Sequence, residues 1–286
     1  MRKLFGALAL VIAAAAPSVA RAQDVGRDVS IWTWDGRISS GNTFRLSSVN
    51  GPVSIEASPD NMAHVRAEKI VNSGNVSDVH FQVIQSGGDV HVCALWLQDS
   101  CEDDGMRSHR NNDDGDGNHH DVRVRFTIKV PAGVRVSAGT VNGEMRVRDV
   151  TSDVSAMTVN GLVEVTNVGG EVRANTVNGR IDVSTKSGPV RANTVNGDIN
   201  ARMGSLARDG EMNFHTVNGS IVVETPPSLD ADVSLDTMHG SITSDWPVQL
   251  TGRFGPRHAE GTIGRGGRSI KLRTLNGSVE LRKTRS

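Results

Sequence analysis

Apolar and polar residues alternate along much of this chain in short runs, and in its second half one four-residue word separates the runs. TVNG occurs at 140–143, 158–161, 176–179, 194–197 and 216–219, with the variants SVNG at 48–51, TMHG at 237–240 and TLNG at 274–277. Apolar residues stand at every second position after each word, as in Ile181 and Val183, and again before the next word, as in Val190 and Ala192. Such alternation, rich in β-branched residues, indicates half-buried strands. Each repeat therefore predicts two strands. No segment after residue 24 has convincing helical periodicity, so the chain is predicted to be all-β.

The spacing of the words favours one all-β architecture. The words from 140 to 194 start 18 residues apart, and the later steps are 22, 21 and 37 residues, the last being about two periods. In a β-solenoid, equivalent residues of successive coils stack about 4.8 Å apart, so a constant step and literal identity both follow. We expect a single-domain, β-helix-like solenoid with two-strand repeats. Asn-Gly is also a strong hairpin signal, so an antiparallel β-sandwich or meander is the alternative. The structural turns are assigned to Asn142, Gly143, Asn160, Gly161, Asn178, Gly179, Asn196, Gly197, Asn218, Gly219, Asn276 and Gly277.

The side chains of the word itself have predictable directions. Strand parity places Thr176 in line with Val172 and Ala174, and therefore inward. Stacked Asn side chains are expected to bond to one another along the axis, as amide ladders do. Val177 then points outward and forms part of an exposed apolar ladder, a partner surface, unless the chain bends at this corner. We favour a bend or bulge that turns the valine inward.

The first 22 residues have the pattern of a secretory signal peptide. Arg2 and Lys3 form a basic start, residues 4–16 are apolar, and Ala20-Arg21-Ala22 offers a cleavage site. An uncleaved membrane anchor is the alternative, but the apolar run is short against the roughly 20 residues that span a bilayer. We expect export to the periplasm or the cell surface, with no membrane span after cleavage.

Residues 23–286 are expected to form one domain with two irregular segments. An insert at 99–121 and a Gly-rich excursion at 246–267 interrupt the repeats, and GPRHAEGTIGRGG within the excursion is typical of a loop. Residues 23–44 are expected to cover the first coil, because a solenoid must protect its terminal edges. Cys93 and Cys101 are the only cysteines, and in an exported protein we expect a disulfide between them rather than two free thiols.

The insert is the segment most similar to a ligand site. It holds eight acidic residues and two arginines, and NDDGDG at 112–117 loosely matches the start of a calcium loop, but the twelfth position is Arg123. Its histidines offer zinc or copper ligands instead. A solvated loop without metal is the simpler interpretation and the one we favour. The candidate metal ligands are Asp113, Asp114, Asp116, His119 and His120.

Other function classes find little support. Without the signal peptide, 28 basic residues stand against 32 acidic ones, a net charge of −4, so we expect no nucleic-acid partner. Glycosidases need two carboxylates across a groove, and Glu144, Asp182 and Asp198 lie on nearby coils. The position after NG nevertheless varies widely from repeat to repeat, and the sequence contains no nucleophile elbow, phosphate loop or HExxH motif. A polysaccharide-active enzyme is therefore a minor alternative, and no cofactor is expected.

Two longer stretches add a family resemblance to this interpretation. VRVRFTIKVPAGVRVSAGTVNGEMRV at 122–147, the TVNG units, and GGRSIKLRTLNGSVELRK at 266–283 resemble the bacterial "putative adhesin" β-strand-repeat family of unknown function. The resemblance extends from about residue 48 to the C-terminus. It implies a β-helix-like fold and an exported or envelope-associated protein. We therefore expect a non-catalytic structural or adhesion role, with an envelope protein or glycan as partner and a metal-binding envelope protein as the alternative.

Overall fold

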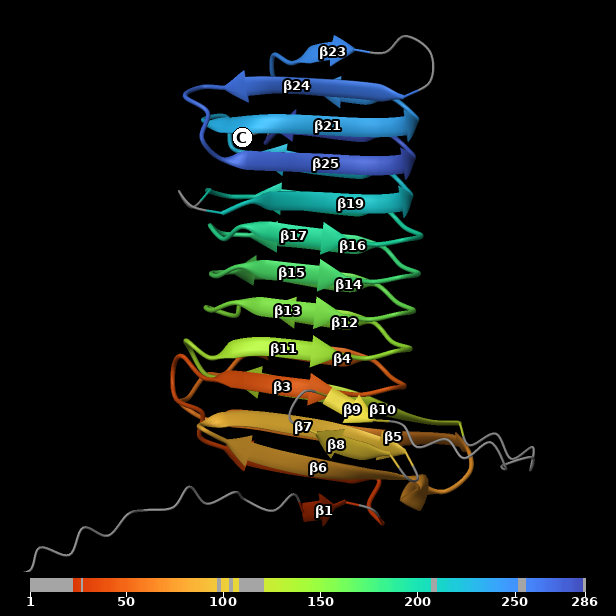
Figure 1. The fold of residues 1–286 in the computed structure, drawn as a ribbon. Coiled ribbons are helices and arrows are strands. Elements are labelled where there is room, and N and C mark those ends of the chain that lie inside the picture. Colours follow the sequence, from red (N-terminus) through yellow and green to blue (C-terminus); the bar gives the residue numbers. More distant parts are fainter. Residues whose placement is uncertain are drawn as a thin grey trace, which may run out of the picture.

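The computed structural model describes residues 23–26, 28–96, 99–102, 105–107, 121–206, 210–251 and 256–284. Two long sheets, here called sheets A and B, enclose one hydrophobic core, and the coils stack along a single axis (Figure 1). Sheet A contains, in spatial order, β1 (Gln23–Val25), β6 (Val79–Ser86), β7 (Asp89–Trp96), β3 (Thr43–Ser47), β11 (Arg135–Gly139), β13 (Val154–Met157), β15 (Val172–Asn175), β17 (Val190–Asn193), β19 (Met212–Asn218), β25 (Ser269–Asn276), β21 (Ala231–His239), β24 (Arg257–Ile263) and β23 (Gln249–Thr251).

Sheet B lies opposite and supplies the second strand of each coil. Its spatial order is β2 (Ile31–Gly36), β5 (Ala63–Ser73), β10 (Asp121–Val130), β4 (Val53–Ala57), β12 (Met145–Arg148), β14 (Val163–Val168), β16 (Ile181–Thr185), β18 (Ile199–Met203), β20 (Ile221–Thr225), β26 (Val279–Lys283) and β22 (Ile242–Ser244). A small third sheet pairs β8 (Ser100–Glu102) with β9 (Gly105–Arg107), and one 3-10 helix, η1, spans Val76–Asp78.

The repeats form a solenoid, as predicted. Strands of successive coils pair in parallel and in register, so that Val154 lies beside Val172 in sheet A and Ile181 beside Ile199 in sheet B. The parallel bridges continue through the corners, for example between Asn160 and Asn178. An antiparallel meander is therefore excluded for the repeats.

The alternation of side chains builds the core. Val172 and Ala174 of sheet A and Ile181 and Val183 of sheet B all point inward and are at most 4% exposed. Each stacks on its equivalent in the next coil, because the parallel register places like residues side by side. The pattern read from the sequence thus specifies both sheets.

At the N-terminal end, the stacking does not follow the order of the chain. The β3–β4 coil lies directly beside the β11–β12 coil, so SVNG at 48–51 joins the stack of TVNG corners. On its other side, β3 pairs in parallel with β7, and β4 pairs in parallel with β10. The chain between β7 and β10 contains no TVNG word, and at this corner the N–H of Val124 of β10 donates to the carbonyl of Asn50. Antiparallel strands β6, β1, β5 and β2 complete this end.

The C-terminal end is also assembled out of sequence order. The last coil, β25–β26, lies between the β19–β20 coil and the β21–β22 coil. The expected loop at 255–267 is wrong in part, because β24 within it is a strand that pairs antiparallel with β21. Ala259 and Ile263 of β24 are buried. An uncovered edge of β21 would be open to pairing with another chain, and β24 covers it.

Candidate interaction surface and polar clusters

The threonine of each word points inward and bonds to the neighbouring coil. Thr158, Thr176 and Thr274 are at most 5% exposed. Their Oγ1 hydroxyls donate to the carbonyls of Gly143, Gly161 and Gly219 at 3.0, 3.2 and 2.8 Å, respectively. A buried carbonyl without a partner is costly, so a hydroxyl is needed at each coil. Valine has the same shape but lacks this donor.

The glycine of each word is required by the close approach of successive coils. A Cβ built on Gly161 or Gly179 would collide with the carbonyl oxygen of the glycine in the coil below. The asparagines bridge in parallel along the same line. The sequence argument placed glycine here because a hairpin turn tolerates positive φ, whereas coil-to-coil contact explains it in the structure.

The asparagine side chains form an amide ladder along the corner. Each Nδ2 donates to the Oδ1 of the asparagine in the preceding coil, at 2.8–2.9 Å. The ladder runs through Asn50, Asn142, Asn160, Asn178, Asn196, Asn218 and Asn276. It adds a side-chain bond to the backbone pairing at each of these coils.

The valine of the word points outward, and the inward direction that we favoured is wrong. Val177 is 39% exposed, although the chain bends at this corner and the N–H groups of Val177 and Asn178 both donate to the carbonyl of Val159. Equivalent residues form one line along the axis, which we call the valine stripe. It consists of Val141, Val159, Val177, Val195, Val217, Leu275 and Met238, of which all but the half-buried Val217 are 37–43% exposed.

A shallow apolar groove lies beside one end of the valine stripe. It has a volume of about 400 Å³, and Val141, Val159 and Val177 line it together with Met157 of β13. Met106 of β9 also lines it, so the β8–β9 hairpin borders the groove. The groove and the stripe make this corner the main apolar surface among the residues described.

The acids considered for glycosidase chemistry are engaged with their neighbours. Glu144 forms an ion pair with Arg146 at 2.6 Å, and Asp182 forms one with Arg180 at 2.7 Å. Asp198 accepts the backbone N–H of Ser220 at 2.8 Å. The two ion pairs join residues two positions apart in one coil, and the third contact joins neighbouring coils, so none of them sets these acids up as a catalytic acid and base.

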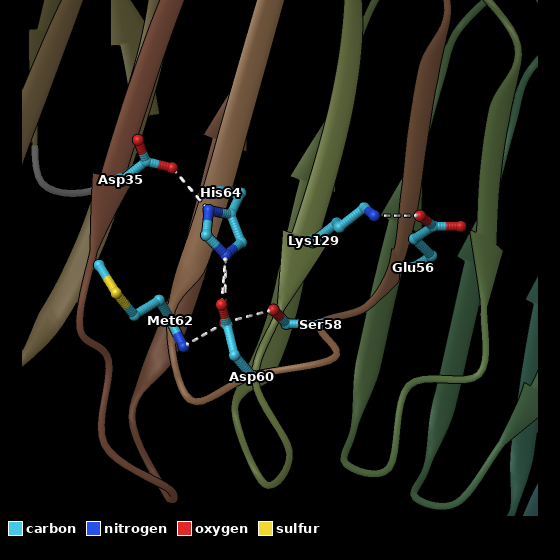
Figure 2. A network of polar contacts seen from close by, with 7 residues as sticks. All are labelled: Asp35, Glu56, Ser58, Asp60, Met62, His64 and Lys129. Atoms are coloured by element: carbon cyan, nitrogen blue, oxygen red, sulfur yellow. Dashed lines mark hydrogen bonds and ion pairs between the residues drawn. The ribbon is translucent and has the colours of Figure 1, made fainter.

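A histidine cluster ties the edge of sheet B to its neighbours. Figure 2 shows His64 of β5 between Asp35 of β2 and Asp60 of the preceding turn. Its Nδ1 lies 2.6 Å from Asp35 and its Nε2 lies 3.1 Å from Asp60. A carboxylate only accepts hydrogen bonds, so both contacts are hydrogen bonds at the same time only when the ring is protonated. The hydrogen bond to Asp35, followed by that to Asp60, raises the pKa of His64 above its ordinary value.

The acid of this cluster is held by its own turn. The backbone N–H of Met62, first, and then His64 and Ser58 lower the pKa of Asp60. Beside the cluster, Lys129 of β10 pairs with Glu56 of β4 at 3.4 Å (Figure 2). Among the described residues, Asp35, Asp60 and His64 do not place three ligand atoms close enough together to share one cation. The cluster fastens strands together.

A similar cluster closes the other end of the solenoid. His258 of β24 places Nδ1 2.7 Å from Asp236 of β21 and Nε2 3.4 Å from Glu260. The hydrogen bond to Asp236 is the main cause that raises the pKa of His258, and Glu260 adds to it. The antiparallel pairs β2–β5 and β21–β24 are therefore each held by a histidine and an aspartate.

A disulfide joins Cys93 of β7 to Cys101 of β8. His91, two residues before Cys93 on the same face of β7, packs against both sulfurs, with Nε2 3.3 Å from Cys93 Sγ and Nδ1 3.8 Å from Cys101 Sγ. The sequence analysis missed this histidine. The alternation of HVC at 91–93 places both side chains on one face, which was the available signal.

The candidate metal ligands of the insert, Asp113, Asp114, Asp116, His119 and His120, lie outside the described residues, so the metal-free loop that we favour stays a prediction and the metal site stays its alternative. Among the described residues, no helix has the length and apolar character needed to cross a membrane.

The parallel two-sheet stack with a repeated Thr-Val-Asn-Gly corner defines a β-solenoid repeat protein. The chain belongs to the Toastrack DUF4097 family, whose sequence profile matches residues 36–282. This confirms the family resemblance seen in the repeats.

Comparison with solved structures finds remote similarity. A "putative cell adhesion protein" from Clostridium sporogenes ATCC 15579 shares 10% identity over 89% of this chain and 99% of that chain, with a TM-score of 0.35. A "putative adhesin" from Bacteroides fragilis NCTC 9343 shares 12% identity over 89% and 97%, with a TM-score of 0.40. At such values, the likeness carries no argument about function. No curated protein matches the chain.

Proposed function

We propose that this chain is an exported, non-catalytic β-repeat protein with a structural or adhesion role in the bacterial cell envelope, and that the valine stripe contacts its partner. The exposed line of apolar side chains is the observation that carries the proposal. Threonine, asparagine and glycine serve the coil itself by hydrogen bonding and close packing. The valine faces solvent, so the solenoid does not need an apolar residue there. A long exposed apolar surface is typical of a binding site.

A protein partner fits this surface better than a glycan does. The stripe is flanked by the uncharged amide ladder and by the apolar groove that contains Met157. Sugar rings are commonly bound on aromatic side chains, and this chain has 3% aromatic residues and no tyrosine. Apolar side chains with a polar rim match the usual composition of protein interfaces.

The test compares binding of two charged variants to isolated envelope fractions. Val159→Lys with Val177→Lys places two cations on the stripe of adjacent coils, and we expect binding to fall at least tenfold. Thr166→Lys with Ser184→Lys, on adjacent coils of sheet B, is the matched control and should bind like the wild type. Prior proteolysis of the envelope distinguishes a protein partner from a glycan. Equal binding by both variants would contradict the role of the stripe.

The non-catalytic assignment and export have their own tests. A broad screen of polysaccharides should give no turnover, and turnover abolished by Asp182→Asn or Glu144→Gln would contradict the proposal. The protein recovered from the producing cell should begin at Gln23. Recovery of residues 1–22 on the mature chain would contradict cleavage.

A further inference from the structure

We propose that, once the Cys93–Cys101 disulfide is reduced, His91, Cys93 and Cys101 form a binding site for a thiophilic cation such as Zn²⁺. One ligand atom from each of the three residues lies within 4.8 Å of the other two. His91 and Cys93 point to the same face of β7, and Cys101 reaches the same point from the β8–β9 hairpin. Two strands thus bring together three donors that zinc prefers.

The distances suit one cation. Tetrahedral zinc with bonds of about 2.3 Å to sulfur and about 2.0 Å to nitrogen separates a sulfur and a nitrogen ligand by about 3.6 Å. Cys93 Sγ and His91 Nε2 are already 3.3 Å apart, and the cation would replace the hydrogen bond that Nε2 shares with Ser47 Oγ at 2.9 Å. The two sulfurs must separate to about 3.8 Å, as two zinc thiolates do. Cys101 can make this movement, because it is half-buried on a short hairpin whereas Cys93 is fully buried within sheet A.

Reduction and binding balance as two steps. A dithiol reductant supplies two electrons and two protons, breaks the S–S bond to give two thiols, and is itself oxidised to a disulfide. The cation then replaces the two thiol protons, which are released to solvent, and the neutral imidazole donates one nitrogen lone pair. Two thiolates and one Zn²⁺ have no net charge, which favours binding at a buried position. Water takes the fourth position.

The donor set also defines the class of cation. Thiolate and imidazole ligands select zinc or copper(I), whereas calcium and magnesium require oxygen ligands. This site differs from the candidate ligands Asp113, Asp114, Asp116, His119 and His120 in its residues and in its dependence on reduction. A bound cation would also hold the β8–β9 hairpin, and with it Met106 at the apolar groove, against sheet A when the disulfide is open.

Cobalt(II) is a suitable probe, because its complexes with thiolates absorb in the near ultraviolet. We expect the mature full-length chain, reduced without oxygen, to bind one Co²⁺ with this absorption and to lose it when Zn²⁺ is added. The oxidised chain should not give the band. His91→Gln removes the imidazole ligand and should weaken Co²⁺ binding roughly tenfold or more. Cys101→Ser should abolish the band, and His64→Gln, a histidine on sheet B, is the matched control.

Three results would overturn the proposal. The first is a reduced wild type without the thiolate band, and the second is a Kd for Co²⁺ unchanged in His91→Gln. The third is a loss of the β-sheet circular dichroism signal on reduction, because the site requires β7 to remain in sheet A. Cobalt bound by the insert alone would lack the thiolate band and would not depend on reduction.

Discussion

The middle coils and the two ends of the solenoid share one pairing rule but have different sequences. From β11 to β20, each coil has similar coils on both sides, and the TVNG corner repeats word for word. At the ends, antiparallel strands such as β2 and β24 close the sheets, and histidine clusters fasten them. The comparison teaches that literal repetition follows from having like neighbours. Where a coil has a different neighbour, the corner residues lose their partners and the sequence diverges.

The largest expected effect is at the middle glycines. Gly179→Ala would drive a Cβ into the carbonyl of Gly161 and should lower the free energy of unfolding by about 3 kcal/mol, as overpacking does. Gly87, in the β6–β7 hairpin of the N-terminal end, has a φ of +59° and open space around it. Gly87→Ala should therefore cost only about 1 kcal/mol, from backbone strain. Urea denaturation measures both, and equal losses would refute the stacking explanation.

The second-largest expected effect is the loss of the hydroxyl of the first residue of the word, which should differ between a middle corner and the first corner. Thr176→Val keeps the side-chain shape but leaves the Gly161 carbonyl without its donor, and should cost about 2 kcal/mol. Ser48 occupies the equivalent position in the first corner, and among the described residues its buried Oγ has no hydrogen-bond partner. Ser48→Ala should be neutral or slightly stabilising in thermal denaturation. A marked loss of thermal stability in Ser48→Ala would contradict the difference expected between the two corners.

Substitutions in the amide ladder should lower stability by less, and again by more in a middle coil than in the first. Asn178 bonds to Asn160 and Asn196, so Asn178→Ala removes two exposed hydrogen bonds and should cost about 1 kcal/mol. Asn50, the first rung, has one ladder partner, Asn142. Asn50→Ala should therefore cost about half as much by urea denaturation. A larger loss for Asn50→Ala would contradict an additive ladder.

The smallest expected effect is a pH dependence of local stability, confined to the two ends of the solenoid. The folded pKa values of His64 and His258 are raised, so their stabilisation is fully present below the unfolded value of about 6.5 and is lost as pH rises through the folded pKa. Hydrogen-exchange protection of β2 and β24 should fall across this window, while β15 is unaffected. His64→Gln and His258→Gln should remove the pH dependence at their own ends. The same fall in β15 would show that the effect is not local.

Much of the solenoid was predictable, because its information is local and repeated. The alternation at Ile181 and Val183 gave the strands, and the 18-residue step gave the parallel stack. Strand parity placed Thr176 inward, whereas Val177 was expected to turn inward because bulges commonly bend strands. The chain does bend at Val177, but its side chain stays exposed, and that error concerned the feature on which the proposed function depends.

The arrangement of the ends was not predictable from the pattern. Nothing local to SVNG at 48–51 indicates that it contacts Asn142, since the intervening strands β5 to β10 contain ordinary alternation. The strand β24 was hidden by glycines that suggested a loop. Such long-range choices depend on which edges remain uncovered, and only the assembled molecule contains that information.

The position of the β25–β26 coil has a consequence for biosynthesis. These strands follow β21 and β22 in the chain, yet they occupy an internal place between the β19–β20 and β21–β22 coils. A growing chain that has reached residue 265 therefore cannot pair the edges of β19 and β21 with their final neighbour. The solenoid is finished by a closing segment, and a chain shortened by its final 18 residues would leave a gap within the stack.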